Sequence, residues 1–405
     1  MNFDTAFIPE NTDNPLSTPV MDLICAGSKG DKQIRRDFAD YSIFPDDDPH
    51  RLAVKELIAK RNFQDIRENK CFGILYGMTL GDAIGARLEF RPVQYEKVFI
   101  DGPGELPDGK FYLKPGQWTD DASMGLCICD SLLSTKGMLN EHDLMQRFLA
   151  WWDLGYNNAF RFDDKRHSVG LGGNISLSFY DYMNGKSKDG FTLAGDSKTS
   201  GNGSIMRLGG VPVCFWDDIS LAEDAAERQS RTIHRGDEAA DCCRLLTFLM
   251  VSLINGGDLK RSLENLGKDF TAKEKSVHCL ANSEIEDNDP DRNWQWKAED
   301  FKYSPARSKK NPGYIGSYAM DATAMALHCV WTTNSAKDAI LKAVNMCGDA
   351  DSVGSVTGQI AGAAYGFSDL PAEWIAAVNK WDNQEIGLRA FRLYHKIWLH
   401  NRKGA

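Results

Sequence analysis

The stretch from Gly77 to Gly85, which reads GMTLGDAIG, decides the fold class of this 405-residue chain. Apolar residues recur at helical spacing from Val54 through Ile66 to Leu75, so a helix is expected to run into this stretch. Its small residues suit either tight packing against another helix or a close approach of the backbone to a ligand. The spacing therefore predicts a helical protein and leaves both uses of the glycines open.

The same helical period recurs along the rest of the chain. Ser335 and Asp338 form a start that resembles a capping box, and Pro371 suits a first helical turn. Runs with the two-residue alternation of β-strands are scarce. We therefore predict an all-α fold, with helices near 122–133, 221–231, 237–254, 319–331, 353–365, 372–380 and 385–398.

Composition predicts a folded protein whose partners are not polyanions. Hydrophobic residues make up 42% and charged residues 26% of the chain, as in ordinary globular proteins. The net charge of −10 repels phosphate backbones and anionic lipids, so a nucleic acid or membrane partner is not expected. The longest apolar run, Leu245–Ile254, is about half the length that crosses a bilayer and predicts a buried helix.

The cysteines and the N-terminal residues predict a cytoplasmic protein. Ten cysteines occur without a CxxC pair, which favours reduced thiols on apolar helix faces. The first residues lack the basic and apolar stretches of a Sec signal peptide. A secreted effector, or one delivered into a host cell, is the alternative.

The sequence divides into an extension and a body. Residues 1–65 contain several prolines and the acidic run Asp46–Asp48, and they predict a partly irregular N-terminal extension. Residues 66–400 form the expected domain. Within it, 284–317 is charged and rich in proline, which predicts a solvated insertion. Its aromatic residues leave a lid or a partner-binding loop as the alternative.

Two acidic clusters are the strongest candidates for chemistry. Thr119-Asp120-Asp121 and Asp349-Ala350-Asp351-Ser352 each carry two carboxylates and one hydroxyl. Six oxygen donors suit a hard divalent cation, and four carboxylates held together would need cations between them, so a two-ion site is the inference. Each cluster is also typical of a helix N-cap, and the spacing does not choose between the two interpretations.

Three further features are ambiguous when taken singly. Gly201–Arg207 is a glycine loop whose amides suit an anion such as a pyrophosphate. His234 lies between two helical stretches, and Tyr318 precedes an alanine-rich helix. An exposed or capping histidine is the alternative for His234.

Taken in order, these segments resemble the ADP-ribosylglycohydrolase family. The resemblance runs from about Cys71 to Gly366 and rests on the order of its motifs. They are Gly81-Asp82-Ala83-Ile84-Gly85 with Glu89, Trp118-Thr119-Asp120-Asp121, Gly201-Asn202-Gly203-Ser204-Ile205-Met206-Arg207, His234, and Gly348-Asp349-Ala350-Asp351-Ser352.

The resemblance implies a compact multi-helix domain with two Mg²⁺ or Mn²⁺ ions in a cleft. The family usually has threonine where Ser352 stands, and commonly a second one where Ala122 stands. Serine keeps the hydroxyl oxygen, and Ala122 is not an expected ligand. The implied metal ligands are Thr119, Asp120, Asp121, Asp349, Asp351 and Ser352.

The resemblance also implies hydrolysis of the bond between C1 of the distal ribose of ADP-ribose and a protein side chain. That bond breaks through an oxocarbenium-like state, and cations that hold the ribose hydroxyls would position the sugar and activate water. Glu89, Asp121 and Asp351 are the implied catalytic carboxylates, with Glu89 polarising the water or moving its proton. The implied substrate-binding residues are Asn202, Gly203, Ser204, Met206, His234 and Tyr318.

The expected partner is an ADP-ribosylated protein, with ADP-ribose as the product. Arginine is the favoured linkage, because bacterial-type family members often act there. Hydrolysis of serine-linked or free ADP-ribose derivatives is the first alternative. A relative that binds ADP-ribose without catalysis is the second, and the clustered carboxylates argue against it.

Overall fold

The computed structural model describes residues 40–104, 109–165 and 167–399. Over these ranges the chain forms seventeen α-helices and no β-strand, which confirms the all-α prediction. None of the described helices is long and apolar enough to cross a membrane. The helices are α3 Arg51–Lys60, α4 Ile66–Gly85, α5 Asp120–Ser134, α6 Glu141–Leu154, α7 Gly173–Met183, α8 Gly210–Cys214, α9 Ile219–Arg231, α10 Asp237–Ile254, α11 Leu259–Glu264, α12 Leu266–Asp269, α13 Lys275–Asn282, α14 Pro305–Lys310, α15 Ala319–Trp331, α16 Ala336–Asn345, α17 Ala350–Tyr365, α18 Ala372–Asp382 and α19 Glu385–Tyr394.

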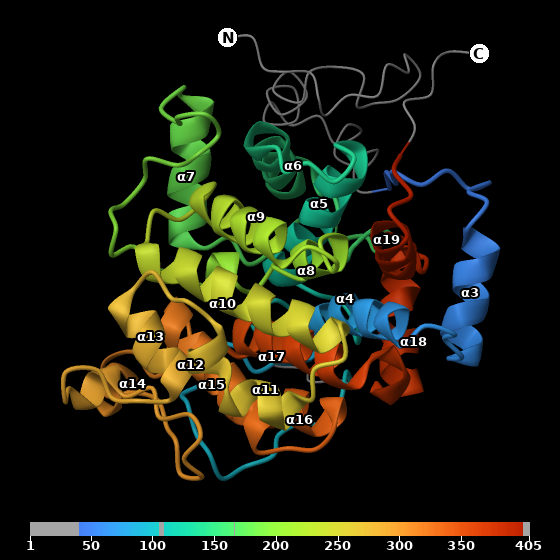
Figure 1. Ribbon diagram of the computed structural model, residues 1–405. Coiled ribbons are helices and arrows are strands. Elements are labelled where there is room, and N and C mark those ends of the chain that lie inside the picture. Colours follow the sequence, from blue (N-terminus) through green and yellow to red (C-terminus); the bar gives the residue numbers. More distant parts are fainter. Residues whose placement is uncertain (1–39, 105–108, 166, 400–405) are drawn as a thin grey trace.

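Helices α4 and α17 lie side by side at the centre of the molecule, with the other helices around them (Figure 1). Almost every side chain of α4 is buried, as expected for a helix without a polar face. The two helices run antiparallel and meet along small residues. A Cβ on Gly77 would lie 2.0 Å from the carbonyl oxygen of Gly358, and one on Gly81 would lie 2.0 Å from that of Gly354. The glycines of α4 are therefore needed for helix packing.

Most predicted helices are present with small shifts in their ends. Ser335 caps α16 by accepting a hydrogen bond from the Asp338 N–H. The predicted helix over 385–398 is too long, because α19 ends at Tyr394 and Lys396 has a left-handed backbone with φ 53°. The predicted helices also omit α6, although Asn140 caps it through the Asp143 N–H.

The predicted solvated insertion over 284–317 is wrong for its aromatic side chains. Trp294, Trp296, Phe301 and Tyr303 are buried in the main core. The Trp296 indole N–H donates to the carbonyl oxygen of Leu280 at 2.7 Å. These buried aromatic side chains fix the segment to the body of the protein, although its composition is typical of a solvated loop.

The described part of the N-terminal extension also packs onto the body. Phe44 is buried in the main core and α3 lies beside α19 (Figure 1). The Arg51 guanidinium donates to Glu385 on α19 at 3.0 Å. Residues 1–39 of the predicted extension lie outside the described residues.

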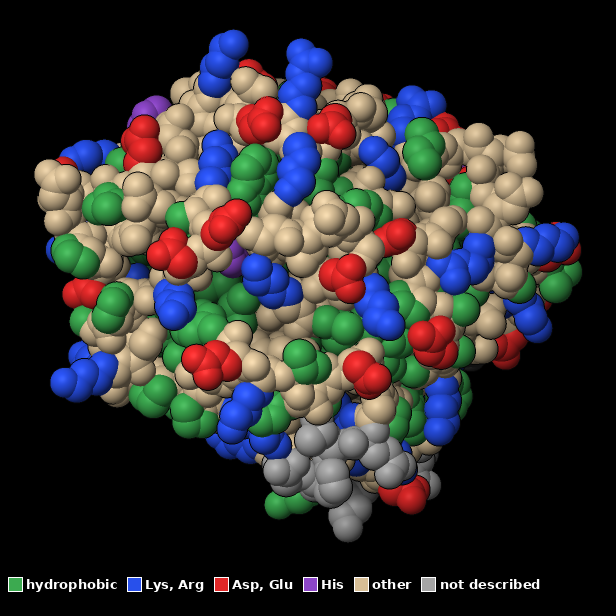
Figure 2. Space-filling model, turned by 90° about the horizontal axis from the view of Figure 1, so that it is seen from below, with side chains coloured by type: hydrophobic (Ala, Val, Ile, Leu, Met, Phe, Trp, Pro, Cys, Tyr) green, Lys and Arg blue, Asp and Glu red, His purple; other side chains and the backbone are tan. Residues whose placement is uncertain are grey.

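The described cysteines and the surface agree with the composition. The nine described cysteines are buried and free, as predicted. On the face shown in Figure 2, the Lys and Arg side chains are interspersed with Asp and Glu and form no continuous basic patch. That face therefore lacks the cationic stripe on which nucleic acid binding depends.

Candidate active site

The site forms where the C-terminal end of α4 meets the N-termini of α5 and α17. Glu89 follows α4, and its backbone N–H donates to the carbonyl oxygen of Gly85 at 3.1 Å. Asp120 begins α5, and Asp349 immediately precedes α17. Antiparallel packing of α4 on α17 brings these segments together although hundreds of residues separate them in the chain.

Neither predicted cluster caps its own helix. The side chains of Thr119 and Asp349 make no capping hydrogen bond at the N-termini of α5 and α17. The carboxylate of Asp82, from α4, accepts hydrogen bonds from the Thr119 and Ala122 backbone N–H groups of α5, at 2.9 Å each. The structure therefore decides against the capping alternative and leaves the carboxylates of both clusters directed elsewhere.

The carboxylates gather into two groups that share one residue. Oxygen atoms of Asp82, Asp121 and Asp351 lie within 4.8 Å of one another, and so do oxygen atoms of Glu89, Asp349 and Asp351. Asp351 belongs to both groups. The Thr119 hydroxyl lies 3.5 Å from Asp351 Oδ2 and 3.3 Å from Asp121 Oδ2.

These groups have too few partners for their negative charge. Glu89 Oε2 and Asp121 Oδ1 are buried without a hydrogen-bond partner among the described residues. Burial, followed by repulsion from Asp351 and Asp349, raises the pKa of Glu89 well above its usual range. Burial raises the pKa of Asp82 to about 6. Oxygen donors with unmet charge are the ligands that hard divalent cations prefer, so these acidic groups could hold a metal ion.

Most of the predicted site residues line a single cleft of about 590 Å³ beside the acidic groups. Thr119 and Asp121 are buried and do not line this cleft. The Thr119 hydroxyl and the Asp121 carboxylate lie close to Asp351, which does line the cleft. The predicted residues that line the cleft are Glu89, Asp120, Asn202, Gly203, Met206, His234, Asp349, Asp351 and Ser352.

Asn202 connects the glycine loop to the acidic groups. Its side-chain Nδ2 donates to Asp349 Oδ2 at 3.0 Å and to the carbonyl oxygen of Gly316 at 3.1 Å. Its backbone N–H donates to the carbonyl oxygen of Ser317 at 2.9 Å. Ser352 lies nearby, with its hydroxyl 3.6 Å from the sulfur of Met206. Asn202 thereby fixes Asp349 against the floor of the cleft.

Two predicted substrate-binding residues do not line the cleft. The hydroxyl of Ser204 accepts from that of Ser230 at 2.9 Å, beneath the glycine loop. Tyr318 donates its hydroxyl to Glu238, which also pairs with Arg292. Ser204 therefore supports the loop from below, and the Tyr318 hydroxyl belongs to an ion-pair group behind the cleft wall.

His234 lines the cleft as a neutral ring. Burial, together with the positive charge of Arg207, lowers the pKa of His234 to about 3. Its Nδ1 has no hydrogen-bond partner among the described residues. Arg207 is itself buried and donates to Gln229 and to the Thr232 hydroxyl, so it ties the glycine loop to the segment that carries His234. A Cβ on Gly203 would lie 2.8 Å from the His234 ring, which explains the glycine.

The sequence prediction missed one carboxylate and most of one wall. Asp82 stands inside the quoted glycine segment, and its being the single charged residue of that segment was the available signal. Gly170 has φ +93°, and a Cβ there would lie 1.9 Å from Asp120 Oδ1. The other missed lining residues have no motif of their own, and they include Lys110, Phe111 and Tyr314.

Comparisons with known proteins agree on one family. A family model described as ADP-ribosylglycohydrolase matches residues 64–401. The ADP-ribosylarginine hydrolase Tri1 of Pseudomonas putida is 31% identical over 76% of this chain and 73% of its own length. The ADP-ribosyl-[dinitrogen reductase] glycohydrolase of Rhodospirillum rubrum is 26% identical over 78% of this chain and 93% of its own. A solved ADP-ribosylglycohydrolase-related protein complex superposes with a TM-score of 0.62 at 27% identity, over 82% of this chain and 98% of that one.

Proposed function

Because this chain belongs to the ADP-ribosylglycohydrolase family of hydrolases, we propose that it removes ADP-ribose from a modified arginine side chain of a protein. Two divalent cations, Mg²⁺ or Mn²⁺, are the proposed cofactors. The modified protein is the proposed partner and ADP-ribose the product. The nine buried free thiols support a reducing compartment, and we propose the cytoplasm as the place of action.

The sharing of Asp351 between two carboxylate groups is the observation that carries this proposal. One carboxylate that contributes to two adjacent groups suits two ions a few ångström apart, whereas a single ion needs only one group. The arginine linkage rests on the names of the relatives from Pseudomonas putida and Serratia proteamaculans, which are both ADP-ribosylarginine hydrolases at 31% identity.

The proposed ligands divide between the two groups. Asp121 and Thr119, with Asp351, form the inner set, and Asp349 with Asp351 forms the set beside Glu89. Asp120 and Ser352 complete the proposed ligands from the cleft wall. When bound, cations of this kind position sugar hydroxyls and lower the pKa of water. Asp82 remains engaged by the backbone of α5 and is proposed to orient Thr119 through the 2.8 Å hydrogen bond from its hydroxyl.

The chain's own groups supply the remaining chemistry. Cations bound beside Glu89 would favour its ionised form, in which the partnerless Oε2 could accept the proton of the attacking water. The water hydroxyl joins C1 of the ribose as the bond from C1 to nitrogen breaks, and the departing neutral guanidine takes up the proton that Glu89 accepted from the water. Asn202, Gly203 and Met206 form the wall proposed to lie along the diphosphate and ribose, with neutral His234 beside them.

Replacement of Asp351 tests the two-metal hydrolase directly. In Asp351→Asn, we expect release of ADP-ribose from an arginine-modified protein to fall by about 10³-fold or more, because both carboxylate groups lose a shared ligand. Paramagnetic resonance of added Mn²⁺ should show at least one of two bound ions lost. EDTA should abolish wild-type activity, and either Mg²⁺ or Mn²⁺ should restore it.

A matched control is Asp224→Asn, which removes an exposed carboxylate on α9. It should leave both turnover and manganese binding unchanged. Full wild-type activity in EDTA, or normal manganese binding by Asp351→Asn, would reject the two-metal site. Manganese binding with no cleavage of arginine-linked ADP-ribose would keep the site and reject the substrate.

A further inference from the structure

Three aromatic rings from separate parts of the chain meet at one end of the cleft. Phe90 follows Glu89, Phe111 comes from the loop before α5, and Tyr314 closes the segment before α15. The ring centroids of Phe90 and Tyr314 are 5.1 Å apart and those of Phe90 and Phe111 are 6.0 Å apart, both edge to face. We call these three residues the aromatic wall.

The aromatic wall already attracts a cation. The Lys110 ammonium lies 3.6 Å from the centroid of the Phe90 ring, which is the geometry of a cation–π interaction. Lys110 is exposed, and none of the described carboxylates forms an ion pair with it. The face of the Phe90 ring thus accepts a cation, and the exposed ammonium there could be replaced by another cation.

The ring of Phe90 is held at this position by the backbone around it. Phe90 has φ +67°, a left-handed conformation that is unusual for a bulky residue. Its N–H donates to the carbonyl oxygen of Gly348 at 3.0 Å, next to Asp349, and its carbonyl would meet any Cβ on Gly313 at 2.6 Å. Two neighbouring segments thus maintain a strained backbone whose effect is to hold an aromatic ring beside the acidic groups.

The aromatic wall and the glycine loop line the same cleft, and both border the acidic groups. Gly201 and Gly203 lie against the His234 ring, and the Phe90 N–H donates to the carbonyl oxygen of Gly348, next to Asp349. Glu89 is adjacent to the wall in sequence, whereas Asp349 touches Asn202 of the glycine loop. In a ligand whose diphosphate lies along the glycine loop and whose distal ribose lies at the carboxylates, the group on ribose C1 would lie beside Glu89, next to the aromatic wall.

We infer that the aromatic wall receives the guanidinium of the modified arginine, which displaces the Lys110 ammonium from the face of Phe90. This inference rests on the proposed function and extends it from the bond that is cut to the residues that recognise the side chain. A guanidinium is flat, cationic and weakly hydrated, so it stacks on aromatic faces better than an ammonium does. A hydroxyl-linked substrate has no cation to place there.

Kinetics of two wall variants test the inference. For Phe90→Leu and Tyr314→Leu, we expect KM for an ADP-ribosylarginine peptide to rise about tenfold with little change in kcat, because the attraction is made equally before and during bond cleavage. Affinity for free ADP-ribose should stay within about twofold of wild type, since the product carries no guanidinium. Tyr180→Leu is the matched control, because Tyr180 on α7 is 56% exposed and Tyr314 is 55% exposed.

Calorimetry provides a test that needs no turnover. Wild-type protein saturated with ADP-ribose and Mn²⁺ should bind ethylguanidinium and not ethylurea, and Phe90→Leu should lose this binding. Lys110→Met should strengthen it severalfold by removing the competing cation.

Each outcome separates this inference from the proposed function. Equal binding of ethylurea, or wall variants that lose ADP-ribose affinity as much as peptide affinity, would reject the guanidinium subsite while the hydrolase stands. Wild-type protein that binds ethylguanidinium but leaves the arginine-linked peptide intact would support the subsite and reject the proposed reaction.

Discussion

At the scale of single residues, burial decides which groups in the cleft carry charge. His234 is surrounded by protein and lies beside the buried Arg207, so its pKa falls to about 3 while an unfolded histidine titrates near 6.5. The ring is then neutral throughout the ordinary pH range. A neutral ring offers one donor and one acceptor to a ligand, which a charged ring does not.

This depressed pKa has a consequence for stability. Below about pH 6.5 the unfolded chain binds a proton that the folded chain refuses, so the contribution of His234 is complete above pH 6.5 and is lost as pH falls toward 3. We expect the unfolding free energy of wild type, relative to His234→Gln, to decrease by about 2 kcal/mol from pH 7 to pH 5. Urea denaturation at both values measures it. A His234 ring that titrates near pH 6.5 by NMR would contradict the prediction.

At the scale of elements, the contact of α4 with α17 places the site. Gly73, Gly77 and Gly81 on α4 each face a glycine of α17, and each pair would clash if either residue carried a Cβ. Asp82 and Glu89 follow the last of these glycines, near the C-terminal end of α4. Asp349 and Asp351 lie at the N-terminus of α17. The distance between the carboxylates therefore depends on how closely the two backbones approach.

Replacement of one glycine in this row should affect stability and metal binding together. In Gly77→Ala, the added methyl would lie 2.0 Å from the Gly358 carbonyl oxygen, so the helices must separate. We expect a loss of about 3 kcal/mol or more in unfolding free energy and a weaker affinity for Mn²⁺. Denaturation and manganese titration measure the two effects. Gly104→Ala, where a Cβ would meet nothing within 4 Å, should change neither; a tolerated Gly77→Ala would disprove the close contact.

The helical spacing of apolar residues correctly predicted the main helices. Residue types that are typical of N-caps were a less reliable guide to which side chains cap a helix. Thr119 has the sequence of an N-cap, yet its hydroxyl donates to Asp82 and the cap of α5 comes from α4. No local pattern shows that a carboxylate 37 residues before Thr119 will perform this role. The choice between cap and ligand was therefore a tertiary question.

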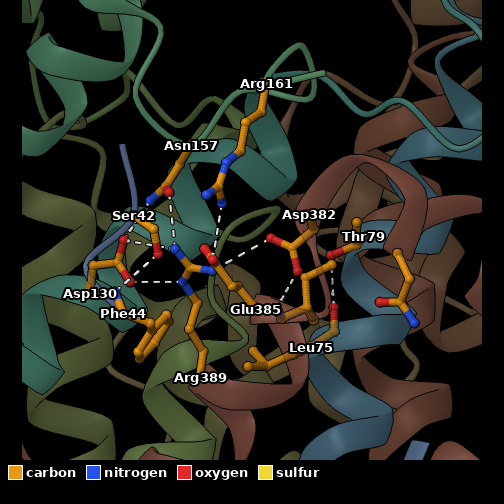
Figure 3. A network of polar contacts seen from close by, with 12 residues as sticks. Ser42, Phe44, Leu75, Thr79, Asp130, Asn157, Arg161, Asp382, Glu385 and Arg389 are labelled. Carbon is orange, nitrogen blue, oxygen red and sulfur yellow. Dashed lines mark hydrogen bonds and ion pairs between the residues drawn. The ribbon is translucent and has the colours of Figure 1, made fainter. Parts of the chain in front are cut away.

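At the scale of the whole molecule, a buried ionic network fastens the chain's first described segment to its last helix. The Arg389 guanidinium on α19 donates to Asp130 on α5 at 2.7 Å and to Asn157 at 3.0 Å (Figure 3). Glu385, one turn away on α19, accepts from Arg161 and also from Arg51 of α3. Helix α5 thus carries the acidic residues Asp120 and Asp121 at its start and a structural anchor, Asp130, in its middle.

Removal of one partner from this network should cost far more than removal of both. In Arg389→Met we expect a loss of about 3–5 kcal/mol in unfolding free energy, because Asp130 stays buried without its cation. The double variant Arg389→Met with Asp130→Asn should recover much of it. Lys60→Met, which breaks an exposed ion pair on α3, should cost at most about 1 kcal/mol. Additive losses in the double variant would contradict the coupling.

The same network bears on the division into domains. The predicted boundary between an extension and a body near residue 65 stays a prediction. Phe44 nevertheless lies in the main core, with the Arg389 guanidinium 5.3 Å from its ring. We propose that 66–400 is the catalytic domain and that residues 40–65 fold as part of the same unit.

The sequence by itself determined the helical class, the acidic clusters and the family, because periodicity, residue chemistry and motif order are all local properties of the chain. Only the tertiary structure decided that Thr119 and Asp349 do not cap their helices, that Asp82 joins the site, and that Ser204 and Tyr318 turn away from the cleft. It also decided that Phe90, Phe111 and Tyr314 form one wall. The physical reason is that these facts depend on which backbones approach across long sequence separations, and close contact between α4 and α17 sets that approach.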